Sequence, residues 1–123
     1  MKRFALLLCL ALASAAAAHA DDAQVAAGKS AFATCSICHA TDKARNGIGP
    51  SLFGVVGRKA GTAAGFSYSK AMTASGITWD ATSLDAFITD PKVKVPGTRM
   101  PFAGLKDAAK RQAIIAYLTT VHD

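Results

Sequence analysis

The sequence is poor in several features that would mark particular folds or partners. It contains no glutamate, so aspartate supplies all 8 acidic residues, and it shows no internal repeat or low-complexity stretch. No segment has the alternating apolar pattern of a half-buried strand. The formal net charge of +6 is modest and scattered, and it falls further once Lys2 and Arg3 are set aside. These absences indicate a small globular protein, and they argue against nucleic-acid binding.

The start of the chain has the features of an export signal. Lys2 and Arg3 precede an almost wholly apolar run over 4–18, and small residues follow at the positions that a signal peptidase reads. We therefore expect 1–20 to be a cleaved secretory signal peptide and 21–123 to be one domain. A retained membrane anchor is the alternative, although the run is shorter than the roughly 20 apolar residues that span a bilayer.

The expected domain contains several short helical segments joined by long loops. Apolar periodicity predicts a helix over 23–34 and another toward the C-terminus after Asp107, which would cap it. The apolar face of this last helix is expected to extend to Val121. A short helix is expected over 68–75, and Asp80 would cap a further one that ends near Thr89, before a proline. Loops of this length in a compact domain usually wrap a ligand.

Cys35 and Cys38, the two cysteines outside the expected signal peptide, indicate what that ligand is. Cys35-Ser36-Ile37-Cys38-His39 is C-x-x-C-H, the signature of covalent c-type haem attachment. Two thiols about one helical turn apart can each add to a haem vinyl group, and the adjacent histidine then supplies a nitrogen to the iron. A thioredoxin-like site would need a preceding strand, and a structural zinc site would need four ligands. A disulfide between the two cysteines would close too short a loop to stabilise much.

A second axial ligand is also predicted. Met100 lies in a loop stiffened by Pro96 and Pro101, and such a loop can hold a thioether still beside a planar ligand. Met72, in the short helix expected over 68–75, is the one rival, and packing is its simpler role. Histidine and methionine ligation would raise the potential and would fill the position where oxygen or peroxide binds.

Beyond these patterns, the whole of 21–123 resembles class I cytochrome c, in the branch of mitochondrial cytochrome c and bacterial cytochrome c2. The motifs that carry the resemblance are long and occur in the family's order: Gly28 and Phe32; Cys35 to His39; Gly-Arg-Lys-Ala-Gly at 57–61; Gly65-Phe66-Ser67-Tyr68; Gly76-Ile77-Thr78-Trp79; Pro96 to Gly104; and Ile115-Ala116-Tyr117-Leu118. The resemblance implies the all-α class I cytochrome c fold, with short helices and loops around one haem.

The resemblance also implies roles for further residues around the haem. The carbonyl of Pro50 would accept a hydrogen bond from the ring of His39. Four other residues would surround the haem propionates or support them: Arg58, Tyr68, Trp79 and Thr98. A separate group would form the contact between the terminal helices: Gly28, Phe32, Ile114 and Tyr117.

The sequence departs from the family pattern near the second axial ligand and around the haem edge. Phe87 stands where many relatives have a tyrosine, and Met72 stands where many have an asparagine. Thr34 and Asp107 occupy positions that are often lysine in mitochondrial members. The basic docking ring is therefore thinner, although Lys92, Lys94 and Arg99 could still form a docking patch.

The resemblance predicts a soluble, periplasmic one-electron carrier with a single haem c and no enzymatic activity or small-molecule substrate. Its expected partners are redox proteins, such as a cytochrome bc1-type donor and a terminal oxidase, reductase or photosynthetic acceptor. Docking is expected to be weak and salt-sensitive, and the protein is expected to be a monomer. Two alternatives stay open: a haem subunit of a periplasmic redox enzyme, and a gas-binding or peroxidatic cytochrome with an open iron site.

Overall fold

The computed structural model describes residues 21–123, and the predicted signal peptide, 1–20, lies outside them. Residues 21–31 are helical, and the remaining helices follow in chain order: η1 (Phe32–Thr34, a 3-10 turn), α2 (Lys70–Ala74), α3 (Ala81–Thr89), α4 (Pro91–Lys94) and α5 (Ala108–Thr119). Within these residues the only strand-like pairing is an isolated bridge between Lys59 and Thr78. The expected all-α class is confirmed.

Aspartate side chains start the two longest of the labelled helices, as predicted. The backbone N–H of Ser83 donates to Asp80 Oδ1 over 2.8 Å at the start of α3, and that of Lys110 donates to Asp107 Oδ1 over 3.1 Å at the start of α5. Each carboxylate satisfies a donor that has no partner inside its helix. The hydrogen bonds from Ser83 also lower the pKa of Asp80, because they favour its charged form.

Several helix boundaries differ from the sequence-based predictions. The first helix, expected over 23–34, already includes residues 21 and 22, and its expected last residues, 32–34, form the 3-10 turn η1. α2 begins at Lys70 and not at residue 68, because the Ser69 hydroxyl caps it by accepting a hydrogen bond from Met72 N over 3.1 Å. Pro91 does more than end α3: it begins α4, where its missing N–H costs nothing. α5 ends at Thr119, so Val121 lies beyond the helix whose apolar face it was predicted to extend.

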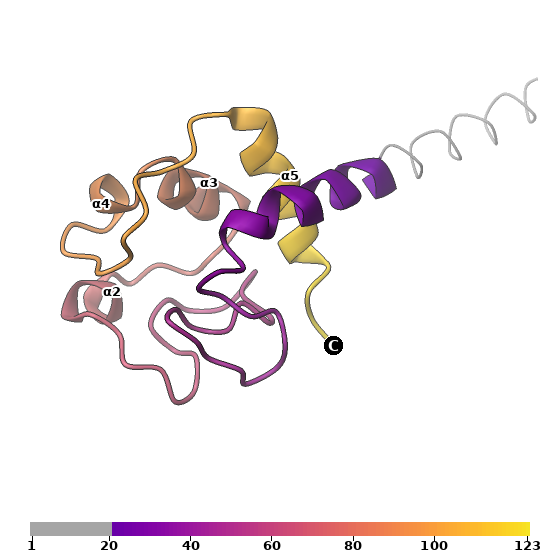
Figure 1. Ribbon diagram of the computed structural model, residues 1–123. Helices are drawn as coiled ribbons and strands as arrows, with labels where there is room; N and C mark the ends of the chain where they lie inside the picture. The colour runs from indigo at the N-terminus through magenta and orange to yellow at the C-terminus, as the bar shows by residue number, and fades with distance from the viewer. Residues whose placement is uncertain (1–20) are drawn as a thin grey trace, which may run out of the picture.

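The terminal helices cross in close contact (Figure 1). Gly28 is buried at the crossing, and a Cβ there would lie 1.8 Å from the carbonyl oxygen of Ala113 in α5. Phe32 and Tyr117 pack edge to face with ring centroids 5.5 Å apart, and Ile114 is almost fully buried. The predicted contact between the terminal helices is confirmed, and it anchors the segment that leads into Cys35.

A second link joins α5 to α3. Arg111 Nε donates to Asp85 Oδ1 over 2.8 Å, and Arg111 Nη1 donates to the carbonyls of Leu105 and Lys106 over 3.0 Å each. Only 11% of the Arg111 side chain is exposed, whereas 42% of that of Asp85 is. One guanidinium therefore ties together α3, α5 and the loop that precedes α5.

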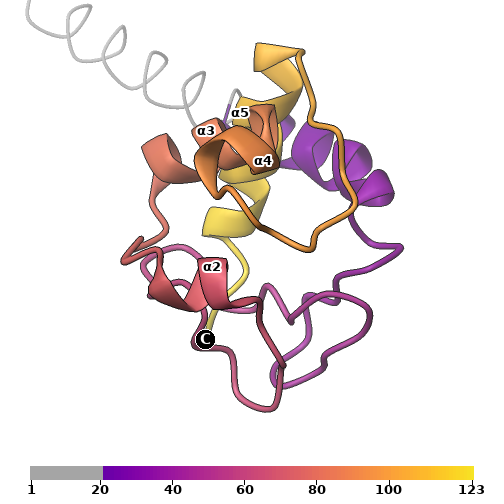
Figure 2. The same cartoon turned by 90° about the vertical axis from the view of Figure 1, so that its left-hand side faces the viewer.

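The helices and the long loops occupy different parts of the molecule. In Figure 2 the N-terminal helix, α3, α4 and α5 gather in the upper half, and the long connection of residues 40–69 runs through the lower half with α2. No helix within residues 21–123 has the length and apolar character needed to cross a membrane. The space between the helical half and the loops holds the candidate site.

Candidate functional site

One cavity of about 630 Å³ brings the predicted site residues together. Its size lies in the range of ordinary ligand pockets, roughly 300–1,000 Å³, and its walls are mostly apolar. All nine residues predicted from the sequence line it: Cys35, Cys38, His39, Pro50, Arg58, Tyr68, Trp79, Thr98 and Met100.

The attachment residues lie on one turn that continues the N-terminal helix. Cys35 N donates to the carbonyl of Phe32 over 2.8 Å, and His39 N donates to the carbonyl of Cys35 over 3.0 Å. Cys35 and Cys38 are not joined to each other by a disulfide. Burial raises the pKa of Cys35, and the neighbouring Cys38 acts in the same direction. The turn thus presents two thiols and an imidazole to the same cavity.

The ring of His39 is held by a single strong contact. Its Nδ1 lies 2.7 Å from the carbonyl oxygen of Pro50. A carbonyl only accepts, so Nδ1 must carry the proton and Nε2 keeps its lone pair in the neutral ring. Burial lowers the pKa of His39, the bond to Pro50 opposes this shift, and the Arg58 charge adds to it. The net result is a neutral imidazole whose free nitrogen can bind a metal.

Gly49 packs directly against the same ring, a role that sequence reasoning missed. A Cβ on Gly49 would lie 2.4 Å from His39 Cε1 and 2.7 Å from Nδ1, closer than real contacts allow. The only sequence signal was the position of Gly49 directly before Pro50, whose carbonyl was predicted to bind His39. The absence of a side chain here lets the ring reach the Pro50 carbonyl.

Arg58 is the half-buried cation of the cavity. Its Nη1 donates to the carbonyl of Phe53 and its Nη2 to that of Ser51, each over 3.0 Å. Burial lowers its pKa, but a guanidinium stays charged at neutral pH. Two of its five N–H donors are used by these bonds. The others remain available to an anionic group inside the cavity.

The remaining predicted residues come from distant parts of the chain. The Tyr68 hydroxyl accepts a hydrogen bond from Ala63 N over 3.0 Å, and Thr98 Oγ1 accepts one from Met100 N over 3.4 Å. Trp79 is buried and packs on Phe87 with ring centroids 5.1 Å apart. These bonds fix the loop that carries Met100 and one wall of the cavity.

Both methionines line the cavity. Met72 projects from the short helix α2, whereas Met100 follows Thr98 in the loop between α4 and α5. Phe87 also lines the cavity, so the position where many class I relatives have a tyrosine contributes an apolar ring here. The choice between the two thioethers as iron ligand stays a prediction in favour of Met100.

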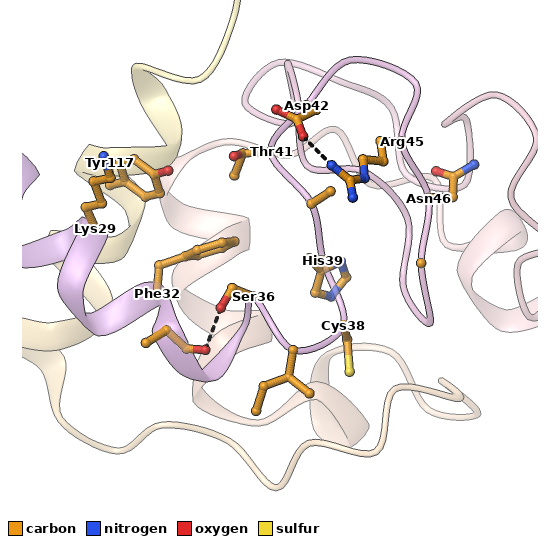
Figure 3. Close-up of a pocket in the computed structure, with 14 residues that line it drawn as sticks. Lys29, Phe32, Ser36, Cys38, His39, Thr41, Asp42, Arg45, Asn46 and Tyr117 are labelled. Carbon is orange, nitrogen blue, oxygen red and sulfur yellow. Dashed lines mark hydrogen bonds and ion pairs between the residues drawn. The ribbon is translucent and has the colours of Figure 1, made fainter.

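A second, more open hollow of about 710 Å³ lies on the outer side of the attachment turn (Figure 3). Lys29 and Tyr117 from the terminal helices line one side of it, and the loop with Asp42 and Arg45 lines the other. Most of its polar groups are already paired. Arg45 bonds Asp42 over 3.1 Å, and Ser36 Oγ donates to a backbone carbonyl over 2.7 Å. This hollow is open and its polar groups are mostly paired with one another, so the more enclosed, apolar cavity of about 630 Å³ is the candidate site.

The donor set of that cavity fits a covalently bound haem. Paired thiols, a neutral imidazole and two thioethers are the ligand chemistry of c-type haems. The half-buried Arg58 suits carboxylates that must leave water, because a buried charge needs a partner. The apolar walls suit a flat, apolar macrocycle.

Comparison with known proteins agrees with this chemistry. The family model for cytochrome c matches residues 25–122. A cytochrome c2 iso-2 from Magnetospirillum fulvum is 50% identical over 91 residues, 74% of this chain and 95% of that protein. A cytochrome c2 from Blastochloris viridis is 44% identical over 119 residues, 96% of this chain and 92% of that protein. The solved structure of cytochrome cH from Methylobacterium extorquens superposes with a TM-score of 0.74 at 52% identity, covering 78% of this chain and 97% of that one. The chain therefore belongs to the cytochrome c family, has the class I cytochrome c fold, and is an electron carrier with one covalently bound haem c.

Proposed function

We propose that this carrier binds its haem through Cys35 and Cys38, with His39 and Met100 as axial ligands, and that it shuttles electrons between redox proteins of the periplasm. One observation supports the assignment above all others: a single cavity is lined by all nine residues that were predicted to hold or surround the haem. These residues come from segments spread over more than half of the chain. Chance burial does not bring such a donor set together.

The bound haem supplies a one-electron couple between ferric and ferrous iron. Pro50 holds the proton on His39 Nδ1 and thereby points Nε2 into the cavity. Thr98 fixes the backbone of Met100, so that the thioether is held in place without a helix around it. The apolar lining excludes water, and Arg58 offers its free donors to the propionates.

We further propose that the protein is not an enzyme. Its relatives are named cytochrome c2, and an axial methionine would occupy the position where a substrate such as peroxide would bind. Suitable partners are a cytochrome bc1-type donor and a terminal oxidase, reductase or photosynthetic acceptor. The export signal predicted over 1–20 motivates the periplasmic location. Mass spectrometry of the exported protein tests this, because it should begin at Asp21.

The axial assignment is tested by optical spectra of the haem-loaded protein in both oxidation states. The ferric spectrum contains a weak band near the red end that reports methionine sulfur on iron. We expect Met100→Ala to lose this band and Met72→Ala to keep it. The two variants are matched controls, because both shorten a methionine that lines the same cavity.

The opposite results would correct the assignment in defined ways. Loss of the band in Met72→Ala alone would make Met72 the ligand. A wild-type protein that lacks the band and binds carbon monoxide at once when reduced would have an open iron site. In that case the carrier role would give way to gas binding or peroxidatic chemistry.

A further inference from the structure

We infer that Asn46 is a site of spontaneous deamidation, and that the modified chain holds the ring of His39 less firmly. Asn46 is the only asparagine in the sequence, and Gly47 follows it directly. Glycine has no side chain to shield its backbone nitrogen, so that nitrogen can approach the preceding side chain closely. The part of the inference that concerns the iron rests on the proposed function, in which His39 is an axial ligand.

The reaction needs only the chain itself and water. The backbone nitrogen of Gly47 attacks the side-chain carbon Cγ of Asn46, a new C–N bond closes a cyclic imide, and the Cγ–Nδ2 bond breaks. Ammonia leaves with the proton of the attacking nitrogen. Water then opens the imide at one of its two carbonyls. Opening at Cγ gives an aspartyl residue, and opening at the backbone carbonyl gives an isoaspartyl residue, whose main chain runs through Cγ.

Water can reach the reacting groups in the folded protein. Gly47 is exposed and Asn46 is half-buried. Both residues line the open hollow on the outer side of the attachment turn, and Figure 3 shows Asn46 next to Arg45 on the loop that borders it. Access of solvent therefore does not prevent the modification.

Three hydrogen bonds restrain it instead. Asn46 Nδ2 donates to the carbonyl of Ala64 over 2.9 Å, and Asn46 Oδ1 accepts from Ser51 N over 3.0 Å. Gly47 N, the attacking atom, donates to the carbonyl of Gly49 over 3.0 Å. Each bond must open before the nitrogen can reach Cγ, and each should slow the attack about fivefold. The reaction therefore proceeds from a transiently opened loop.

The product cannot restore the closed arrangement. An acid at position 46 lacks the N–H donor, so its carboxylate would face the carbonyl oxygen of Ala64 with no proton between the two acceptors. The isoaspartyl product also inserts an extra carbon into the main chain. A transient opening of the loop thereby becomes a permanent change.

The extra carbon lies just before the segment that holds the histidine ring. Gly49 packs against the ring, and its N donates to the carbonyl of Cys38 over 2.9 Å. The Pro50 carbonyl lies 2.7 Å from His39 Nδ1. A lengthened chain displaces Gly49 and Pro50 and weakens this bond, which makes the imidazole a poorer donor to ferric iron. The reduction potential should therefore rise.

The rate is tested by incubating the haem-loaded protein at mildly alkaline pH, folded and in guanidinium chloride, and locating the new acid by peptide mass spectrometry. We expect the unfolded protein to react about 100-fold faster, equivalent to about 2.8 kcal/mol of protection. In guanidinium chloride, Gly47→Ala should react about tenfold more slowly than the unaltered chain, equivalent to about 1.4 kcal/mol, because its methyl group shields the nitrogen. This comparison does not depend on whether the variant folds.

Two results would overturn the modification site. One is a folded protein that carries no modified form after an incubation about 100-fold longer than the half-life of the unfolded reaction. The other is an unchanged rate in unfolded Gly47→Ala, which would exclude attack by this nitrogen.

The effect on the iron is tested with the isoaspartyl form, separated by chromatography. Asn46→Asp is the matched control, because it adds the same charge to a backbone of normal length. We expect the isoaspartyl form to have a higher reduction potential and a lower melting temperature than Asn46→Asp. Equal potentials would overturn the link to His39. The proposed function fails on a different result, namely a missing methionine band or open coordination in the unaltered protein before incubation.

Discussion

Replacing Gly28 with alanine should push the terminal helices apart. A Cβ at this position would lie 1.8 Å from the carbonyl oxygen of Ala113, 2.5 Å from its carbonyl carbon and 2.9 Å from Tyr117 Cβ. The nearest obstacle is backbone, so no side-chain rotation can relieve the contact. The N-terminal helix would have to move away from α5 by roughly 1 Å or more to restore a normal separation.

The magnitude follows from two opposing effects. Alanine favours a helix over glycine by about 1 kcal/mol, whereas overpacking of a tight contact costs about 1–3 kcal/mol. Because the obstacle at Gly28 is a carbonyl of the partner helix, we take the upper end of the cost. The net destabilisation is then about 2 kcal/mol, which lowers the melting temperature of a domain of this size by roughly 10 °C.

The assay is thermal unfolding of the haem-loaded protein, followed by far-ultraviolet circular dichroism. Ser30→Ala serves as the control, because Ser30 is exposed on the same helix. The control should melt within a few degrees of the unaltered protein. A Gly28→Ala protein that melts at or above the unaltered protein would refute the reasoning, since the helix crossing would then tolerate a side chain at no cost.

Three further changes give defined expectations. Gly49→Ala should displace the ring of His39, because the new Cβ would lie 2.4 Å from it; we expect a loss of about 1–3 kcal/mol in thermal unfolding and a changed haem spectrum. Arg111→Met should lower the free energy of unfolding, measured with guanidinium chloride as denaturant, by about 2 kcal/mol. The substitution removes the charged hydrogen bond to Asp85 and two hydrogen bonds to carbonyls, and the expected loss is kept this small because the carboxylate is partly exposed. Asp80→Asn should leave stability at pH 7 nearly unchanged, since asparagine caps as well as aspartate. The folded-state pKa of Asp80 is lowered, so its charge contributes stability above the unfolded pKa, about 3.9, that is lost as the pH falls through the lower folded value. The melting temperature of Asp80→Asn should therefore fall less steeply with acidification than that of the unaltered protein.

Each of these expectations has a result that contradicts it. An unaltered spectrum and melting temperature in Gly49→Ala would mean that the histidine ring can shift freely. For Arg111, the control is Lys110→Met, an exposed neighbour whose side chain makes no hydrogen bond within residues 21–123; equal effects of the two would remove the special role of the guanidinium. Equal acid slopes in the unaltered and Asp80→Asn proteins would mean that the cap charge does not contribute.

Local chemistry made much of this protein predictable from its sequence. Asp80 and Asp107 predicted the starts of α3 and α5. A carboxylate directly before an apolar periodic segment accepts hydrogen bonds from the N–H groups of the first turn, and this contact does not depend on tertiary structure. The attachment turn was equally predictable. Thiols one helical turn apart and an adjacent histidine carry their chemistry in the spacing itself.

Errors arose where one residue can serve two local purposes. Pro91 was interpreted as the end of a helix, and it is also the first residue of α4. The fixed backbone angle of proline suits both roles, and only the capping contact from Asp90 to Val93 N, over 3.4 Å, selects the second. Val121 fits the apolar face of α5 by spacing, but the helix ends at Thr119.

The sequence by itself determined the starts of the helices and the chemical groups of the site: the thiols of Cys35 and Cys38, the imidazole of His39 and a thioether in a stiff loop. Only the tertiary structure decided which groups meet. It placed the Pro50 carbonyl 2.7 Å from His39, left room for that ring beside Gly49, and brought Cys35, Arg58 and Met100 to the walls of one cavity. The physical reason is the distance along the chain over which each interaction acts. Capping and attachment depend on atoms a few residues apart, whereas these contacts depend on how loops close around a shared core, and no local pattern records that closure.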